Sequence, residues 1–391
     1  MKGFVPLYTN TMSIKIKIIL LFIFFKTEFF CQTYPLFGNE TQVTINGLTF
    51  DAMEPSLSID GNVLFFNSLN DGITTSLHYA SRVNDSVFNY IGLVPIVNQT
   101  VTPRLDAVSS LDSANNFYWV SLRSYPTYLE NLHRIRFLNV GYTNFGRVYG
   151  DFYINQPGYL IMDATINYNG NELIYCNAYF NNCSGLPCEA SMGIATKLND
   201  STFNKVANTS SLMFNINDTS NYLVYAPHIS KDGLELYYTR LLKTGVQTEI
   251  VVSVRTTTTS SFSSPSVLVT SPSITPEGPV LTTDKSKMYY HKKLGSLYRI
   301  FYQTRVIVSK LDENLSSQEV NIFPNPTSNF ITIQNENLDE NSKIELYSTI
   351  GELLITTINK KIDLSTFENG VYILKFKQDF RTLTKKVILK K

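Results

Sequence analysis

A short pattern that recurs five times constrains the fold of this chain more than any other feature. Each copy contains a strand-like run, a tight polar turn and a second strand-like run that ends in large, mostly aromatic residues. The first copy, residues 54–66, reads EPSLSIDGNVLFF, with its turn at Asp60-Gly61. An Asp-Gly pair between two such runs is a strong hairpin signal, because glycine adopts the positive φ of these turns without steric cost. Each copy is therefore predicted to form a β-hairpin.

The spacing of the copies indicates an array of similar units. The later copies read DAVSSLDSANNFYW, DATINYNGNELIYC, APHISKDGLELYYT and EGPVLTTDKSKMYY, and the five copies begin at residues 54, 106, 163, 226 and 277. The separations of 52, 57, 63 and 51 residues leave room for a second hairpin in each unit. A four-stranded unit with this period is typical of a β-propeller blade. We therefore expect an all-β fold with a five-bladed β-propeller over residues 33–310, and a degenerate sixth blade within residues 141–160 is the alternative.

The fifth unit is short, which raises the question of how the array ends. The run from Gln42 to Phe50 has strand character and belongs to none of the five copies. Pairing this run with the last unit would close the ring and remove an exposed sheet edge. We expect it to complete the fifth blade.

Composition agrees with a β protein and argues against a charged partner. The chain of 391 residues is 43% hydrophobic and contains 24 Tyr and 25 Phe. Aromatic and β-branched residues favour strands. The net charge of +1 provides no global attraction to nucleic acid or to an anionic membrane. We expect no nucleic-acid partner.

The N-terminal segment predicts export. Lys15 and Lys17 precede an apolar run from Ile18 to Phe25, and a cleavage point is expected near Cys31-Gln32. This run is much shorter than the ~20 residues that a membrane span requires. Residues 1–32 are therefore interpreted as a signal peptide, residues 1–11 as an extension upstream of it, and no transmembrane segment is expected after its removal.

Removal of the signal peptide would leave Cys176, Cys183 and Cys188. Export permits a disulfide, and Cys183 and Cys188 bracket the turn-rich sequence Ser-Gly-Leu-Pro. We expect these two residues to pair and Cys176 to be a buried thiol, although Cys176 could replace either partner. Three thiolates around zinc is the alternative, but neither a CxxC spacing nor a nearby histidine supports a metal site.

The chain changes character after the repeats. Residues 311–319 read LDENLSSQE, which is linker composition, and residues 320–391 contain a separate series of short strand-like runs. These runs predict a small Ig-like β-sandwich. Positive φ is expected at Gly351 and Gly370, which lie at strand boundaries.

Two resemblances follow from these motifs. PSLSIDGNVLFF at 55–66 and HISKDGLELYY at 228–238 resemble the WD-type repeats of Tol-system periplasmic propellers, a likeness that covers roughly residues 33–310. The tail, with FPNPTS at 323–328 and LSTFENGVYIL at 364–374, resembles the type A C-terminal sorting domain of the type IX secretion system of Bacteroidetes-like bacteria. That resemblance implies export across the outer membrane, with the translocon and a sortase-like peptidase as partners. The sorting-motif residues would be Pro324, Asn325, Pro326, Gly351, Gly370, Tyr372, Lys385 and Lys386.

The motifs of common catalytic sites are absent from the sequence, which contains no GxSxG, HExxH, phosphate loop or dinucleotide fingerprint. One group of acidic residues remains as a candidate site. Four of the five repeats begin with a carboxylate, and in a propeller these positions would lie near one mouth of the central channel: Glu54, Asp106, Asp163 and Glu277. Converging carboxylates can share acid and base roles or bind Ca²⁺. By analogy with five-bladed arabinanase-type glycosidases they predict glycoside hydrolysis; the alternative is that they belong to the repeat and accept backbone hydrogen bonds.

A second candidate surface lies in the insertion at residues 124–160. It is rich in tyrosines that we expect to be exposed and that could stack on sugar rings: Tyr125, Tyr128, Tyr142, Tyr149 and Tyr153. The alternative is that these side chains pack the insertion onto its neighbouring blade. The sequence thus predicts a secreted or cell-surface propeller that binds a glycan or protein, with a glycoside hydrolase and a structural surface protein as the other hypotheses.

Overall fold

The computed structural model describes residues 34–183, 185–245, 247–271, 276–306, 320–334, 343–349, 351–378 and 381–391. Two compact units divide the chain, Met1–Val306 and Ile307–Lys391. The predicted signal peptide (1–32) and linker (311–319) lie outside the described residues. Among the residues that are described, no helix is both long and apolar enough to cross a membrane.

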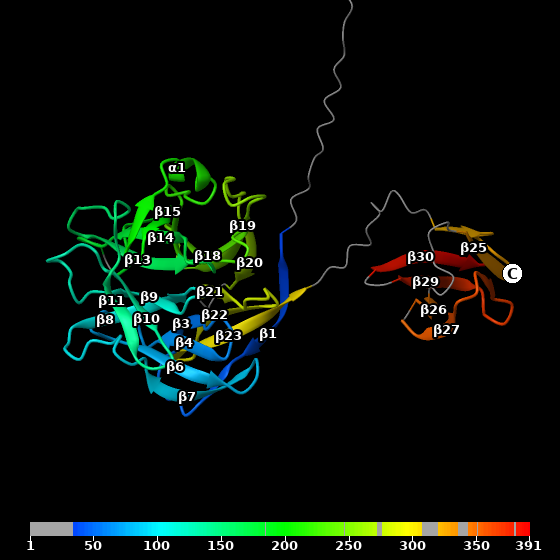
Figure 1. Cartoon of the computed structure of the whole chain (residues 1–391), viewed down its shortest axis with the longest axis horizontal. Helices are drawn as coiled ribbons and strands as arrows, with labels where there is room; N and C mark the ends of the chain where they lie inside the picture. The colour runs from blue at the N-terminus through cyan, green and yellow to red at the C-terminus, as the bar shows by residue number, and fades with distance from the viewer. Residues whose placement is uncertain are drawn as a thin grey trace, which may run out of the picture. The chain divides into compact units, whose positions relative to one another are not determined.

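The first unit contains five antiparallel-based sheets, numbered here in chain order and visible in Figure 1. Sheet 1 has the order β2 (Thr44–Asn46), β7 (Val87–Leu93), β6 (Leu77–Arg82), β4 (Val63–Asn67), β3 (Met53–Leu57). Sheet 2 has the order β11 (Tyr142–Arg147), β10 (Leu132–Phe137), β9 (Asn116–Ser121), β8 (Arg104–Leu111), β5 (Thr74–Thr75). Sheet 3 has the order β12 (Tyr149–Gly150), β16 (Thr202–Lys205), β15 (Glu189–Asn199), β14 (Glu172–Tyr179), β13 (Tyr159–Ile166).

The remaining two sheets of this unit have four strands each. Sheet 4 has the order β17 (Tyr222–Ile229), β18 (Glu235–Leu242), β19 (Thr248–Val254), β20 (Ser266–Thr270). Sheet 5 has the order β1 (Leu36–Gln42), β23 (Leu297–Val306), β22 (Lys287–Leu294), β21 (Glu277–Leu281). One short helix, α1 (Thr209–Leu212), lies between sheets 3 and 4 in the sequence. Residues 141–160, considered for a sixth blade, instead supply edge strands β11 and β12 to sheets 2 and 3.

The five sheets form a closed ring. The inner strands β3, β8, β13, β17 and β21 contact one another in sequence order, and β21 contacts β3 again. A separate hydrophobic core fills each of the five interfaces between neighbouring sheets, including the interface between sheets 5 and 1. The aromatic residues that end the repeated hairpins, such as Phe66, Trp119 and Tyr290, are fully buried in these cores. The fold of this unit is therefore all-β and propeller-like.

The ring closes through a different strand from the one predicted. Strand β1 pairs with β23, more than 250 residues later in the sequence, so Leu36–Gln42 completes sheet 5. The predicted run from Gln42 to Phe50 contains β2, which pairs in parallel with β7 of sheet 1. The prediction of N-terminal closure holds, but its residues were placed about six positions too late.

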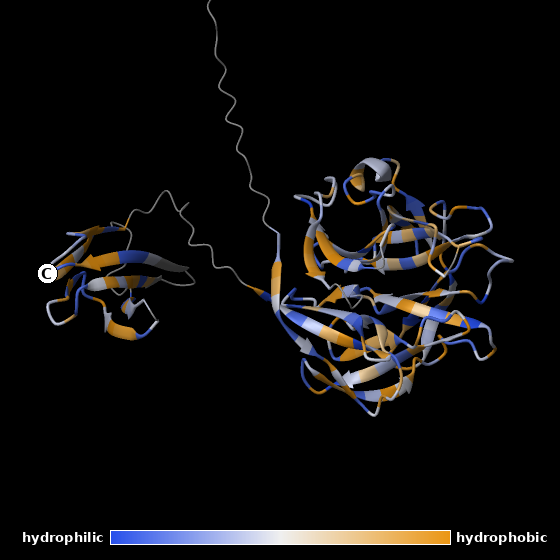
Figure 2. Cartoon of the chain, turned by 180° about the vertical axis from the view of Figure 1, so that it is seen from behind, coloured by the Kyte–Doolittle hydropathy of each residue, from blue (hydrophilic) through white to orange (hydrophobic). Residues whose placement is uncertain are grey.

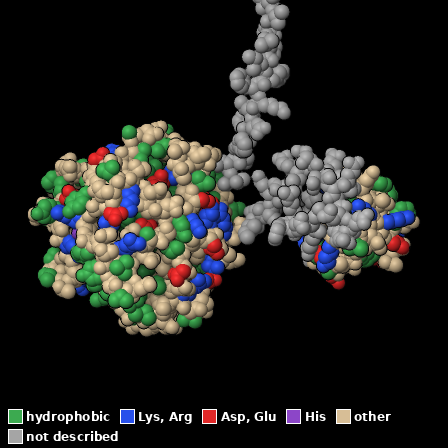
Figure 3. Space-filling model, viewed as in Figure 1, with side chains coloured by type: hydrophobic (Ala, Val, Ile, Leu, Met, Phe, Trp, Pro, Cys, Tyr) green, Lys and Arg blue, Asp and Glu red, His purple; other side chains and the backbone are tan. Residues whose placement is uncertain are grey.

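The second unit contains two small sheets around a core of its own. Their orders are β24 (Asn321–Phe323), β25 (Phe330–Gln334), β28 (Lys361–Asp363), and β27 (Leu353–Thr357), β26 (Lys343–Ser348), β29 (Gly370–Gln378), β30 (Arg381–Leu389). In both units apolar residues recur along the strands (Figure 2). Charges of both signs are scattered over the face of the first unit shown in Figure 3.

Candidate functional site at the start of the inner strands

A β-bulge interrupts each of the five inner strands, within the first residues of β3 and β21 and farther along β8, β13 and β17. The register shifts between Met53 and Ser56, and again at the matching places in the other four hairpins. Four of these bulges contain a residue with positive φ: Glu54, Val108, Ala226 and Gly278. A bulge bends its strand and re-aims the neighbouring side chains. The repeat therefore determines which side chains face the centre of the ring at this end.

Three carboxylates converge at this end, from sheets 1, 3 and 5. The Glu54 Oε1 atom accepts a hydrogen bond from Asn70 Nδ2 at 3.0 Å, while its buried Oε2 atom has no partner. The Asp163 side chain is 1% exposed, and its Oδ2 accepts the Ala226 N–H at 3.0 Å. The third, Glu277, is hydrogen-bonded to the Tyr225 hydroxyl and keeps 23% of its side chain exposed.

Burial raises the pKa of all three carboxyls, and repulsion from neighbouring carboxylates adds to the rise for Glu54 and Glu277. Burial raises the pKa of Glu54 to about 8, and the charges of Asp163 and Glu277 add to the effect. Burial raises the pKa of Glu277 to about 7, with the Asp163 charge as a further cause, and the pKa of Asp163 to about 6. Asp163 therefore ionises first, and its charge opposes ionisation of the other two. Near neutral pH the cluster contains both protonated and charged carboxyls.

His291 lies behind this cluster and is fully buried. Its Nδ1 atom accepts the Glu54 N–H at 3.0 Å, and burial lowers the pKa of the imidazole to about 3. The ring is therefore neutral, and because Nδ1 is an acceptor, the proton lies on Nε2. The Nε2 atom has no hydrogen-bond partner and lies 3.8 Å from Glu277 Oε2. Gly278 has a φ of +65°, and a Cβ there would meet both Glu54 Cα and His291 Nδ1 at 3.3 Å.

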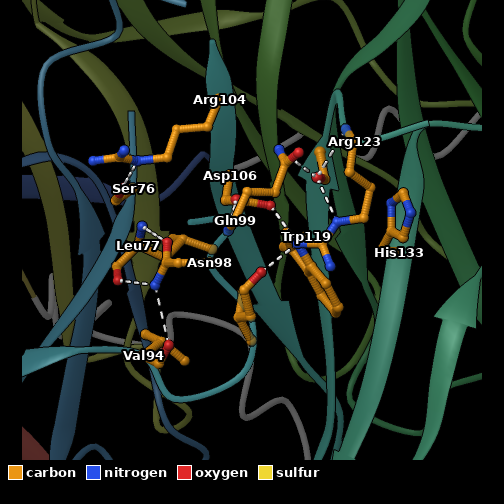
Figure 4. A network of polar contacts seen from close by, with 12 residues as sticks. Ser76, Leu77, Val94, Asn98, Gln99, Arg104, Asp106, Trp119, Arg123 and His133 are labelled. Carbon is orange, nitrogen blue, oxygen red and sulfur yellow. Dashed lines mark hydrogen bonds and ion pairs between the residues drawn. The ribbon is translucent and has the colours of Figure 1, made fainter. Parts of the chain in front are cut away.

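Asp106 does not share this environment (Figure 4). Its Oδ2 accepts the Gln99 N–H at 2.7 Å, and its Oδ1 accepts hydrogen bonds from Trp119 Nε1 at 3.1 Å and Arg123 at 2.7 Å. The side chain is fully buried. Because its oxygens are occupied by these partners, Asp106 serves the structure of sheet 2, which is the alternative that the sequence had left open. It is not among the groups whose charges affect the pKa of Glu54, Asp163 or Glu277.

The interior of the ring contains a cavity of about 90 Å³ lined by the inner strands, and Glu54 lies at its wall. Ser56 and Ser109 face each other across two sheets, with 2.5 Å between their hydroxyl oxygens. Among the described residues, no group of three or more His, Cys, Asp or Glu side chains is placed to hold a metal ion.

The five tyrosines of the insertion divide into two groups. Tyr128, Tyr142 and Tyr149 are exposed, and Arg147 lies over the Tyr128 ring at 3.9 Å. Tyr125 is half-buried and its hydroxyl accepts the Gly158 N–H. Tyr153, predicted to be exposed, is 8% exposed because its ring stacks on Phe152 and its hydroxyl donates to Val148 O. Binding of a ligand by the exposed tyrosines remains a prediction.

The cysteines and the tail motifs have structural partners. Cys183 and Cys188 form a disulfide, and Cys176 is a buried free thiol. In the tail, the Asn325 side chain binds the backbone of β30 at two points, donating to Lys386 O and accepting the Ile388 N–H, each at 2.8 Å.

Other motif residues of the tail have separate environments. The Tyr372 hydroxyl donates to Glu368 O at 2.7 Å. Gly351 has the expected positive φ, but Gly370 does not, because it lies inside the paired part of β29.

Sequence reasoning missed two residues of the site, Tyr225 and His291. The repeats were aligned at their first acidic residue, which places Glu277 opposite Glu54. The structure instead aligns Gly278 with Glu54 and Ala226, each of which precedes a proline at its bulge. In that alignment Tyr225 corresponds to Glu277. The shared proline was the signal in the sequence that could have revealed this register.

Comparisons with known proteins identify the tail. A family model described as "Secretion system C-terminal sorting domain" matches residues 321–390, which confirms the resemblance drawn from the tail motifs. Such domains are sorting signals of type IX secretion, so this chain interacts with that machinery and is exported to the cell surface or secreted. No curated protein matches the chain.

The similarity between solved structures and the ring is limited to the backbone fold. A family 117 glycoside hydrolase (Zg3597) from Zobellia galactanivorans is 11% identical, with a TM-score of 0.48 over 70% of this chain and 90% of that one. A mannose phosphorylase (MPT-4) from Leishmania mexicana is 11% identical, with a TM-score of 0.40 over 68% and 88%. TolB from Acinetobacter baumannii is 9% identical, with a TM-score of 0.35 over 66% and 55%. Likeness at this level carries no information about activity.

Proposed function

We propose that the first unit is a five-bladed β-propeller that acts outside the cell by binding a glycan where Glu54, Asp163 and Glu277 converge. The observation that carries this proposal is the convergence itself. The charges of Asp163 and Glu277 both raise the pKa of Glu54, and the charge of Asp163 also raises the pKa of Glu277. These three of the four acidic repeat positions therefore lie close together, an arrangement that protein folding alone would disfavour. In contrast, the carboxylate oxygens of the fourth residue, Asp106, accept hydrogen bonds from the Gln99 N–H and from Arg123.

The chemistry of the cluster suits a sugar. Carboxyl oxygens, an imidazole N–H and a phenolic hydroxyl provide both acceptors and donors, which is the pattern that sugar hydroxyls require. Partial exposure of Glu277 leaves an approach from solvent. Because the pKa of each carboxyl is raised, a large net negative charge on the cluster is unfavourable near neutral pH. A cluster with little charge supports an uncharged ligand.

Glycan binding can be tested by calorimetry on the full chain with neutral, amino and acidic oligosaccharides. We expect binding to at least one set, and we expect Glu277→Gln to weaken it about tenfold, the effect of one lost hydrogen bond to a charged group. Glu189→Gln is the matched control, because Glu189 is exposed and bonded only to the Tyr159 hydroxyl. Failure of every set to bind, or equal loss in the control, would contradict the proposal.

A second candidate function is glycoside hydrolysis, and the spread of pKa values favours it. At neutral pH Glu54 would be protonated and Asp163 charged, as an acid and base pair requires. Release of reducing ends from polysaccharides measures this activity, and Glu54→Gln should abolish it while binding persists. Binding without turnover at any pH between 5 and 9 would leave the protein a binding module.

We also propose that residues 320–391 form an Ig-like sandwich that a sortase-like peptidase removes during export. The two hydrogen bonds from the Asn325 side chain to the backbone of β30, together with a hydrophobic core of its own, support this unit as a self-contained one. Mass spectrometry of the protein recovered from the medium tests the idea. A mature product that retains Lys391 would contradict it.

A further inference from the structure

The carboxylate cluster contains an unused donor, and its surroundings define the group that would bind it. His291 is fully buried, yet its Nε2–H makes no hydrogen bond. A buried polar group without a partner costs stability, so such groups are rare in folded proteins. The Glu277 Oε2 atom lies 3.8 Å from Nε2, which is too far for a direct hydrogen bond. A donor and an acceptor therefore lie side by side with neither satisfied by the other.

We propose that this pair recognises a single hydroxyl group of an uncharged sugar, which accepts from His291 Nε2–H and donates to Glu277 Oε2. The inference rests on the proposed glycan site and names the residue that selects its ligand. An oxygen about 2.8 Å from each atom would bridge their 3.8 Å separation, and because Nε2 is buried, neighbouring side chains have to move to admit it. His291 is thus a specificity-determining residue.

A backbone hydrogen bond determines which ligand groups His291 can bind. Because the Glu54 N–H occupies Nδ1, the imidazole cannot present a lone pair at Nε2 and offers only a donor there. An ammonium group has no acceptor for that donor. A ligand carboxylate could accept from it but would meet Glu277, Asp163 and Glu54. A hydroxyl both donates and accepts, so it suits the site whether Glu277 is charged or protonated.

Two substitutions separate this role from a structural one. In His291→Asn the amide oxygen can take the place of Nδ1 and keep the bond to the Glu54 N–H, while the Nε2–H donor is lost. His78→Asn is the matched control, since His78 is also a buried strand histidine, hydrogen-bonded to the Tyr90 hydroxyl in sheet 1.

Calorimetry with the full chain supplies the first readout. The probes are cello-, xylo- and galacto-oligosaccharides as the neutral set, chitosan oligosaccharides as the amino set and oligogalacturonates as the acidic set. We expect the wild type to bind a neutral oligosaccharide, and His291→Asn to weaken it about tenfold while His78→Asn leaves it unchanged. Tighter binding of the amino or acidic set, or unchanged binding in His291→Asn, would overturn the inference and leave glycan binding intact. If no set binds, the proposed function fails, and the inference fails with it.

Nitrogen NMR of ¹⁵N-histidine protein supplies a readout that does not depend on the variant folding. The chain contains four histidines. The signal of His291 should show a neutral ring protonated at Nε2, and its Nε2–H proton should move downfield when the bound neutral oligosaccharide saturates the site. A ring protonated at Nδ1, or an Nε2–H signal that the ligand leaves in place, would overturn the inference.

Discussion

Asp106 in sheet 2 and Glu277 in sheet 5 both lie shortly before the bulge of their inner strand, and their environments are opposite. Asp106 is fully buried and its oxygens accept from a backbone N–H, an indole and a guanidinium. Glu277 is partly exposed and faces two other carboxylates, with only the Tyr225 hydroxyl as a partner. One carboxylate therefore stabilises the ring, whereas the other is held at a cost. A carboxylate near the bulge can serve folding in one sheet and remain free for a ligand in another.

The largest effect is expected from Asp106→Ala. The change leaves the Arg123 guanidinium, the Trp119 indole N–H and the Gln99 N–H without their acceptor. Loss of one partner of a buried ion pair costs about 3 kcal/mol or more. Urea unfolding monitored by tryptophan fluorescence measures this, since Trp119 is the single tryptophan. A loss below 1 kcal/mol would show that the structural role assigned to Asp106 is wrong.

The free energy of unfolding should fall as pH rises, because of the other three carboxyls. Their pKa values in the folded protein, about 6 to 8, exceed the ordinary values of 3.8 and 4.5. The folded state thus binds more protons than the unfolded state between about pH 4 and pH 8, and stability is lost across that window. We expect a loss of about 2 kcal/mol in the free energy of unfolding. This is less than the sum of the three pKa shifts would give, because the carboxyls interact and their shifts are not additive. Urea titrations of wild type and Glu54→Gln/Glu277→Gln check this; the double variant should lose most of the slope.

Gly278→Ala should destabilise the protein by about 1 to 2 kcal/mol. Alanine is strained at a φ of +65°, and its Cβ would press on Glu54 Cα and His291 at 3.3 Å. Gly295→Ala is the control, because Gly295 has a φ of +63° with open space around it. The difference between the two variants isolates the crowding at the carboxylate site, and equal losses would argue against it.

The smallest effect is expected from Glu54→Gln, which should stabilise the protein by about 1 kcal/mol at pH 8. Removing a repelled carboxylate relieves the cluster, and Gln keeps the bond from Asn70. At pH 5, where Glu54 is already protonated, the gain should vanish. Thermal unfolding at both pH values measures the difference, and a destabilisation at pH 8 would mean that Glu54 supports the ring as Asp106 does.

Local patterns in the sequence predicted much of the fold and part of the site. Asp60-Gly61 and its equivalents mark hairpins because turn geometry depends on neighbouring residues. The closing strand was misplaced because its partner β23 lies more than 250 residues away, and nothing local in Leu36–Gln42 records that pairing. Tyr153 was misjudged for the same reason, since its burial depends on Phe152 and the Val148 carbonyl.

By itself, the sequence determined the repeat, the acidic start of four hairpins, the candidate disulfide and the sorting tail, because these follow from residue type and short spacing. Tertiary structure decided which carboxylates remain free. That outcome depends on loop partners such as Gln99 and Arg123 for Asp106, and on the bulges that bring Glu54, Asp163 and Glu277 together across three sheets. Charge interactions and burial act through space, so neighbours in the sequence could not reveal them.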